Sequence, residues 1–203
     1  MKKLCIALAL ALAVVLGAVG TGMALLLRGG ISAKVEPTHA ETVIARELKG
    51  VGIPREYRQL PNPVPISKEV IKAGRGHFAD HCAICHANDG SGQTEMGRNL
   101  YPRAPDLRLA QTQQLTDGEL FYIIENGVRL TGMPGCGDGT VEGKRASWHL
   151  VHFIRHLAQL TPQEKLEMQR LNPKTPEEWR EMQKDEEFLK GKEPANHEDA
   201  HHH

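Results

Sequence analysis

The sequence predicts an all-α protein, in which a small helical domain with long loops follows one membrane-spanning helix and precedes a helical extension. Three observations lead to this prediction. A charge-free apolar run lies near the N-terminus, helical periodicity recurs in three later segments, and stretches rich in Gly and Pro separate those segments. A chain of 203 residues has room for one ordinary domain with extensions. The expected parts are a membrane anchor or signal (1–30), a proline-rich extramembrane spacer (31–66), the domain (67–160) and a helical extension with a histidine-rich tail (161–203).

The apolar run from Leu4 to Leu27 is long enough to cross a bilayer as a helix. A cleaved signal peptide normally has a shorter apolar region, and Ala18-Val19-Gly20 is only a weak candidate for a cleavage site. An uncleaved anchor is therefore the favoured reading. Lys2 and Lys3 precede the run and favour a cytoplasmic N-terminus, so the rest of the chain is expected on the outer side of the membrane.

The overall charge and the next segment say less about function. Twenty-five basic and 25 acidic residues cancel, so no overall field favours nucleic acid as a partner. Between residues 29 and 65 the four prolines at positions 54, 61, 63 and 65 predict a spacer without long regular elements. Within it, Val43, Ile44 and Leu48 have the spacing of a short amphipathic turn.

The domain is expected to contain three helices. Ser67 is an N-cap for a first helix that runs up to the cysteines near position 82, and a glycine within it, Gly74, suggests close contact with another helix. Thr116 caps a second helix over 117–126. The last runs over 148–160 with one apolar face. Segments 88–108 and 131–143 are expected to be loops, and the cap signatures at Thr161 and Thr175 predict two further short helices.

The most specific motif is Cys82-Ala83-Ile84-Cys85-His86, which is the sequence that attaches a c-type haem. Two thiols at this spacing add to the two vinyl groups of one porphyrin, and the adjacent imidazole binds the iron from one side. A bare Cys-x-x-Cys also occurs in redox dithiols and zinc sites. The first would need a strand before the pair and the second another ligand pair, and the sequence predicts neither. Haem is the favoured cofactor.

A haem iron has a second axial position, for which Met133 is the best candidate. It lies in a glycine-flanked loop 47 residues after His86, enough chain to reach the opposite face of the ring. The nitrogen rivals are His149, His152 and His156. These three fall on a stripe away from the apolar face of their helix, so they are expected to be solvated.

Taken together, residues 67–160 resemble the class I cytochrome c family in its bacterial single-haem form. The resemblance rests on the Gly74/Phe78 helix, Cys82-Ala83-Ile84-Cys85-His86, Ala104-Pro105-Asp106-Leu107, Asn126-Gly127, Thr131-Gly132-Met133-Pro134 and the closing helix from Trp148. It implies the cytochrome c fold with one covalent haem c, held by Cys82 and Cys85. His86 is then the proximal ligand and Met133 the distal one.

The resemblance also implies supporting contacts. Pro105 is the loop proline whose carbonyl accepts the other N–H of His86, which orients the ring. Gly74 and Phe78 meet Phe153 where the first and last helices cross. Cys136 departs from the family, because relatives often carry a large aromatic there. It is read either as a small buried residue or as a free thiol near the haem edge.

The tail contains four histidines, His197, His201, His202 and His203. They form a secondary candidate metal site, a tail without a role, or an expression tag.

The expected function is electron transfer, without enzymatic activity of the chain's own, between protein redox partners on the outer side of the cytoplasmic membrane. The chain is then a tethered periplasmic carrier or a subunit of a respiratory complex. A quinol-oxidising complex, a dehydrogenase or a terminal oxidase are the partner classes considered, and residues 4–27 make the membrane contact. The alternatives are a haem enzyme such as a peroxidase and a haem-based redox or ligand sensor, both of which need Met133 to be displaceable.

Overall fold

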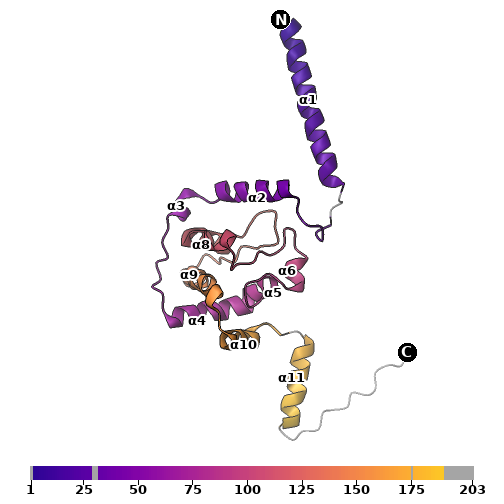
Figure 1. Cartoon of the computed structure of the whole chain (residues 1–203). Coiled ribbons are helices and arrows are strands. Elements are labelled where there is room, and N and C mark those ends of the chain that lie inside the picture. Colours follow the sequence, from indigo (N-terminus) through magenta and orange to yellow (C-terminus); the bar gives the residue numbers. More distant parts are fainter. Residues whose placement is uncertain (1, 29–31, 175, 190–203) are drawn as a thin grey trace, which may run out of the picture.

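The computed structural model describes residues 2–28, 32–174 and 176–189, and within these residues all regular secondary structure is helical (Figure 1). The predicted all-α class is confirmed. A compact group of helices and loops lies between the N-terminal helix α1 and the C-terminal helix α11, which both stand clear of it in Figure 1.

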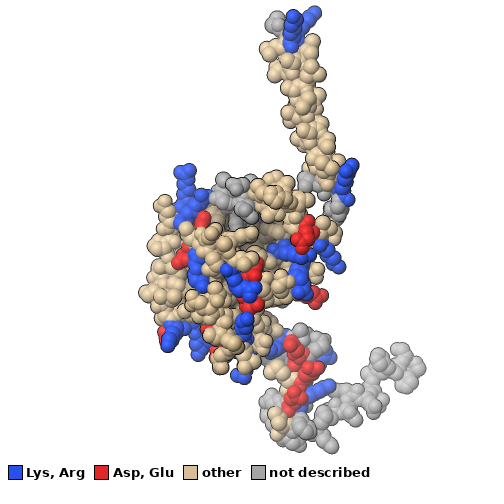
Figure 2. Space-filling model, in the orientation of Figure 1, with Lys and Arg blue, Asp and Glu red and all other residues tan. Residues whose placement is uncertain are grey.

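Helix α1 (Lys2–Leu27) is the predicted apolar segment. Its stretch Lys2–Leu25 is long and apolar enough to cross a membrane, with a mean hydropathy of 2.6, and none of it is buried against the rest of the chain. Figure 2 shows that the helix has no charged residues along its length and basic residues at both ends. Length, composition and exposure are those of a membrane-spanning segment or a signal sequence.

The expected spacer contains a helix that the proline argument missed. Helix α2 (His39–Gly52) has 14 residues and begins with a complete capping box, in which Thr38 and Glu41 satisfy each other's backbone N–H groups. The prolines lie at its two ends rather than inside it, because Pro37 precedes Thr38 and Pro54 follows the last turn. The expectation of a segment without long regular elements was therefore wrong.

The second half of the same segment packs on the domain. Ile53 is buried, and short helix α3 (Arg55–Arg58) places the ring of Tyr57 against the core aromatics of helix α8 (Asp117–Asn126). Gly118 of α8 lies so close to the carbonyls of residues 57 and 60 that a side chain has no room there. Asn62 donates its side-chain amide to the carbonyl of Trp148 at 3.1 Å. The structured domain thus begins near residue 53, before the predicted boundary at 67.

The first domain helix is interrupted just before the cysteines. Helix α4 (Lys68–His77), capped by Ser67 as predicted, continues as one π-helical turn, η1 (Phe78–Cys82), and then as the short helix α5 (Ala83–His86). A π turn has one more residue per turn than the α-helix, and such turns frequently occur at functional sites.

The last domain helix, α9 (Val141–His156), crosses α4. It begins seven residues before the predicted start, because Thr140 accepts a hydrogen bond from the Gly143 N–H and caps it, and it ends in a 3-10 turn, η2 (Leu157–Gln159). At the crossing, a Cβ on Gly74 would clash with the carbonyl of His149 and lie 3.0 Å from Cβ of Phe153. The rings of Phe78 and Phe153 are 5.2 Å apart. The predicted contact of the first and last helices is confirmed.

Two glycines of α4 provide a matched test of this crossing. Gly74→Ala should destabilise the domain by roughly 1–3 kcal/mol, because the backbone of α9 cannot move away cheaply. Gly76→Ala should be neutral or stabilising by up to about 1 kcal/mol, because its Cβ would meet only Leu171 Cδ1 at 4.0 Å and alanine favours the helix. Urea unfolding followed by circular dichroism measures both. Equal effects at the two positions would contradict the close-packed crossing.

Helix α10 (Pro162–Leu171) closes the domain and rests beneath α4 in Figure 1. Met168 is fully buried in the core, and Arg75 of α4 forms ion pairs with Glu164, at 3.0 Å, and with Glu167. The carboxylate of Glu164 also accepts hydrogen bonds from the Thr161 N–H at 2.9 Å and from His156 Nε2 at 3.0 Å. Helix α11 (Pro176–Leu189) confirms the second predicted extension helix.

The environment of Glu164 predicts a pH dependence of stability. Burial raises the pKa of this carboxyl, but hydrogen bonds from Thr161 and His156 and the charge of His156 together lower it below its ordinary 4.5. Because the folded-state pKa is depressed, the contribution to stability is complete above pH 4.5 and is lost as the pH falls through the lowered value.

Glu164→Gln should therefore cost about 1–3 kcal/mol at pH 7 and flatten the loss of stability below pH 4.5. Glu167→Gln is the control, since the Glu167 side chain is 39% exposed against 16% for Glu164, and it should cost less than about 1 kcal/mol. Denaturant titrations at pH 3.5, about 5 and 7 measure the difference. Parallel pH profiles of the parent and Glu164→Gln would refute the assignment.

Candidate functional site

The three residues of the haem motif lie at the end of the interrupted helix. Cys82 ends η1, and Cys85 and His86 lie in α5, which stops at Ala87 with a positive φ of 59°. Both thiols are free and half-buried, and His86 is 8% exposed. The helical backbone of α5 keeps the two thiols and the imidazole within one turn of one another.

The following loop is fixed to this turn. The Gly92 N–H donates to the carbonyl of His86 at 2.8 Å, and the Leu107 N–H donates to that of Gly90 at 2.8 Å. Gln113 then links the loop to α9, because its amide donates to the carbonyls of Leu107 at 2.7 Å and Ile154 at 3.0 Å. These contacts hold the stretch that carries Pro105 against the ring of His86.

The imidazole of His86 lies in an apolar setting. Its ring is 6.5 Å from that of Phe78, and Nδ1 is buried without a hydrogen bond of normal geometry. Burial lowers the pKa of His86, while the backbone carbonyl of Pro105 acts against this and raises it. The neutral imidazole is the form that binds a metal ion. The predicted neighbour of the ring, Pro105, is thus beside it.

The thiols differ in their surroundings. Burial, and to a lesser extent the neighbouring thiols of Cys136 and Cys85, together raise the pKa of Cys82 to about 12. Burial alone raises the pKa of Cys85. Cys82 is therefore held as a neutral thiol, in an electrostatic environment shared with Cys136.

Met133 lies in a loop that folds back on the end of α8. The Val128 N–H donates to the carbonyl of Met133 at 3.1 Å, and the Met133 N–H donates to Thr131 Oγ1 at 3.1 Å. Cys136 N–H donates to the carbonyl of Ile124 at 2.9 Å. A side chain at Gly127, where φ is +68°, would clash with the backbone of residues 133–135. The methionine itself is half-buried.

This loop and the cysteine motif come together although 47 residues separate His86 from Met133. The electrostatic effect of Cys136 on Cys82 requires the two sulfur atoms to be near each other. Leu100 adds a second link, because its side chain contacts Gly132. A side chain at Gly97, three residues before Leu100, would clash with the carbonyl of Cys85.

The prediction that the three histidines of α9 are solvated was wrong. His152 Nε2 donates to the carbonyl of Val64 at 2.7 Å, and His156 bonds Glu164. Nε2 of His149 is buried without a partner among the described residues. The segment before Ser67 therefore covers His152, and α10 covers His156. Neither segment belongs to the helix whose periodicity predicted the exposed face. All three side chains are half-buried.

The remaining candidate residues are Cys136 and the histidines of the tail. Cys136 is exposed, so the reading as a buried filler was wrong, and the reading as a free thiol agrees with the structure. The tail histidines His197, His201, His202 and His203 lie outside the described residues. In the part of the chain that is described, no group of three or more His, Cys, Asp or Glu side chains surrounds a common point as a ready metal site.

The residues present fit a covalently attached haem. Two free thiols, a buried neutral imidazole and a half-buried thioether from a separate loop are the donor set that such a group requires. Beside the motif, an open pocket is lined by Ile84, Thr94, Glu95, Met96 and Asn99.

Comparison with known proteins relates the central part of the chain to a described family. Residues 69–154 match the family model described as cytochrome C oxidase, cbb3-type, subunit III. No curated protein matches the chain. The matched segment begins in α4 and ends in α9, so it contains the cysteine motif, the loop with Pro105 and the loop with Met133. This match supports a c-type cytochrome family for the matched segment of the chain.

Proposed function

We propose that this chain is a single-haem c-type cytochrome, tethered to the outer face of the cytoplasmic membrane, that transfers electrons between protein redox partners. The observation that carries the proposal is the buried, neutral imidazole of His86 directly after two free thiols, within a segment of the c-type cytochrome family. Family membership itself supports haem-based electron transfer.

In this proposal Cys82 and Cys85 form the two thioether bonds, His86 is the proximal ligand and Met133 the distal one. When bound, the haem supplies a one-electron iron couple, whose ferrous state a thioether ligand favours. The chain's own residues orient the two ligand side chains and shield them from water. Phe78 packs beside the imidazole, and the neighbouring Pro105 carbonyl would accept a hydrogen bond from its second nitrogen once the ring binds the iron. Hydrogen bonds of the Met133 backbone with Val128 and Thr131 hold the thioether loop.

The location follows from α1 and the residues around it. Its uncharged length supports a single membrane pass, and Lys2 and Lys3 support a cytoplasmic N-terminus. The partners proposed are a quinol-oxidising complex or dehydrogenase on the donor side and a terminal oxidase on the acceptor side. The oxidase is supported by the matching family model, which describes a subunit of such an enzyme.

The proposal is tested on full-length protein purified from native membranes in mild detergent. We expect a low-spin spectrum that cycles between reduced and oxidised forms, no rapid binding of carbon monoxide to the reduced form, and copurification of a quinol-oxidising or oxygen-reducing complex. Rapid carbon monoxide binding with a high-spin ferric spectrum would instead favour the alternative, an enzyme or sensor with a displaceable Met133.

The tether has a separate test. Alkaline carbonate should leave the native protein in the membrane pellet, whereas a variant lacking residues 4–27 and exported by a cleavable signal should be released. Release of the native protein by carbonate would show that α1 does not remain as an anchor.

A further inference from the structure

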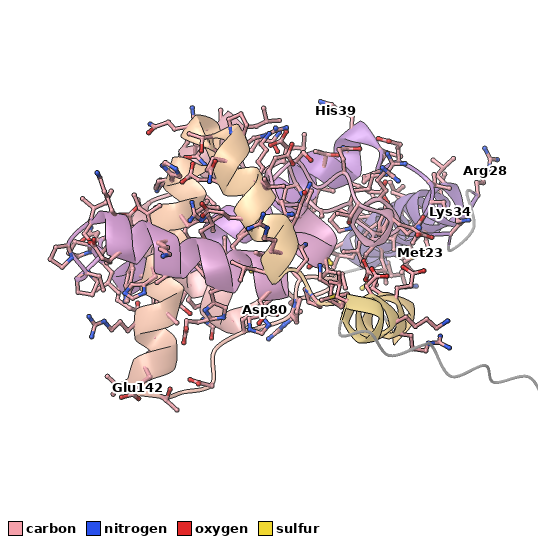
Figure 3. All side chains as sticks on the ribbon, turned by 90° about the horizontal axis from the view of Figure 1, so that it is seen from below. Met23, Arg28, Lys34, His39, Asp80 and Glu142 are labelled. Atoms are coloured by element: carbon pink, nitrogen blue, oxygen red, sulfur yellow. The ribbon has the colours of Figure 1, made fainter. Side chains whose placement is uncertain are left out.

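The last residue of α4 and the π-helical turn that follows it carry three side chains that bind divalent transition metals, in the order His77-Phe78-Ala79-Asp80-His81. Residues at i, i+3 and i+4 lie on one face of a helix. The turn also lies at the surface, since the side chains of His81 and Asp80 are 60% and 52% exposed, and His77 is half-buried. Asp80 is labelled in Figure 3. None of these three residues has a part in the haem proposal.

The distances agree with a shared ion. The rings of His77 and His81 have centroids 4.8 Å apart. Two imidazoles on one zinc ion, with Zn–N bonds of about 2.0–2.1 Å and bond angles between about 90° and 109°, have centroids about 4.5–5.2 Å apart. His81 Nε2 and Asp80 Oδ2 are 3.2 Å apart. For the same bond lengths and angles, two donor atoms of one ion are about 2.9–3.4 Å apart.

From these separations we propose that His77, Asp80 and His81 form a surface site for a divalent transition metal, Zn²⁺ or Cu²⁺, with water completing the coordination. Imidazole nitrogen with one carboxylate oxygen is a donor set that suits both ions. The described side chains do not yet surround a common point, so binding includes a side-chain rotation. The exposure of Asp80 and His81 makes such a rotation inexpensive.

The protonation of the site also suits a metal. Burial and the neighbouring His81 lower the pKa of His77, against a smaller opposite effect of Asp80. The imidazole is therefore neutral at pH 7, and an ion does not have to displace a proton from it. His149 also lies within electrostatic range of His77.

The test uses full-length, haem-loaded protein in which the tail histidines at 197, 201, 202 and 203 are replaced by alanine. Zinc binding is measured by calorimetry, and Cu²⁺ is measured by electron paramagnetic resonance, in which nitrogen ligands split the signal. We expect one ion per chain. His77→Ala and His81→Ala should each weaken binding at least about tenfold, and Asp80→Asn should weaken it less. His39→Ala, which removes an exposed histidine of α2, should change nothing.

The haem absorption spectrum of each variant verifies folding. Absence of zinc binding in the tail-substituted protein would overturn the proposal and assign any metal affinity to the tail. Unchanged affinity in both His77→Ala and His81→Ala would also overturn it. A rise in midpoint potential on adding zinc, absent in His81→Ala, is expected if the haem proposal holds, because His81 adjoins Cys82. Calorimetry tests the metal site independently of that proposal.

Discussion

Replacing both Cys82 and Cys85 with alanine is expected to abolish covalent haem attachment completely. Without the thiols no bond to the porphyrin vinyl groups forms, and only the axial ligands hold the group. Haem should then be extracted by acidified acetone, and haem staining of a denaturing gel should give no band at the mass of the chain. The apoprotein should also be less stable, because a small domain has only a limited core of its own.

Cys136→Ala is the matched control, because it removes a third thiol from the same neighbourhood without touching the motif. It should retain covalent haem. Haem that resists extraction in the Cys82/Cys85 double variant would refute the attachment proposal. Loss of covalent haem in Cys136→Ala would show that this thiol takes part in attachment.

Met133→Ala should change the electronic state of the iron. If Met133 is the distal ligand as proposed, removing its thioether opens that position, so the ferric protein should lose the far-red band typical of methionine ligation and turn high-spin or take up water. The midpoint potential should fall, on the order of 0.1–0.3 V within the range of about 0.8 V that axial ligands control. The reduced variant should bind carbon monoxide. Optical redox titration and carbon monoxide difference spectra measure these changes.

The control for this variant is Met96→Ala, in the short helix α6 (Glu95–Arg98). Met96 is the other methionine of the loops, and its side chain is 49% exposed. Its removal should leave the spectrum and potential unchanged. If Met133→Ala keeps the parent spectrum, another residue is the distal ligand. His149 is then the first candidate, because its Nε2 has no partner in the described chain.

The sequence was most informative where one local pattern decides the structure. Two helix starts were predicted by their caps, at Ser67 and Thr116. The close contact of two helices was predicted by the mid-helix glycine at position 74. A capping box depends on two side chains three residues apart, and a glycine in mid-helix indicates a close neighbour. Such signals do not depend on the rest of the fold.

Helix α2 was missed although its signal was present. Thr38 and Glu41 form a capping box that is visible in the sequence, but the nearby prolines predicted a spacer without long helices. Proline breaks a helix only from within, and Pro37 and Pro54 are both outside. The π turn η1 was beyond prediction, because one extra residue in a turn leaves no composition signature.

The environment of the α9 histidines depends on tertiary contacts. Helical periodicity gave the face of each histidine correctly, but the partners that cover this face are Val64 and Glu164. Both belong to segments whose docking could not be read from the sequence. The same holds for the closeness of Cys136 and Cys82, which only the folded chain brings about.

The docked position of α2 limits how far the domain can travel from the membrane. Tyr101 donates its hydroxyl to Glu41 at 2.8 Å, and Arg103 pairs with Glu36 at 2.6 Å, so the chain is fastened to the domain from Glu36 onward. Glu36 then follows Arg28 by only eight positions in the sequence. At about 3.3–3.6 Å per residue this stretch reaches no more than about 30 Å. If α1 spans the membrane as proposed, a partner must offer its own redox centre close to the lipid surface.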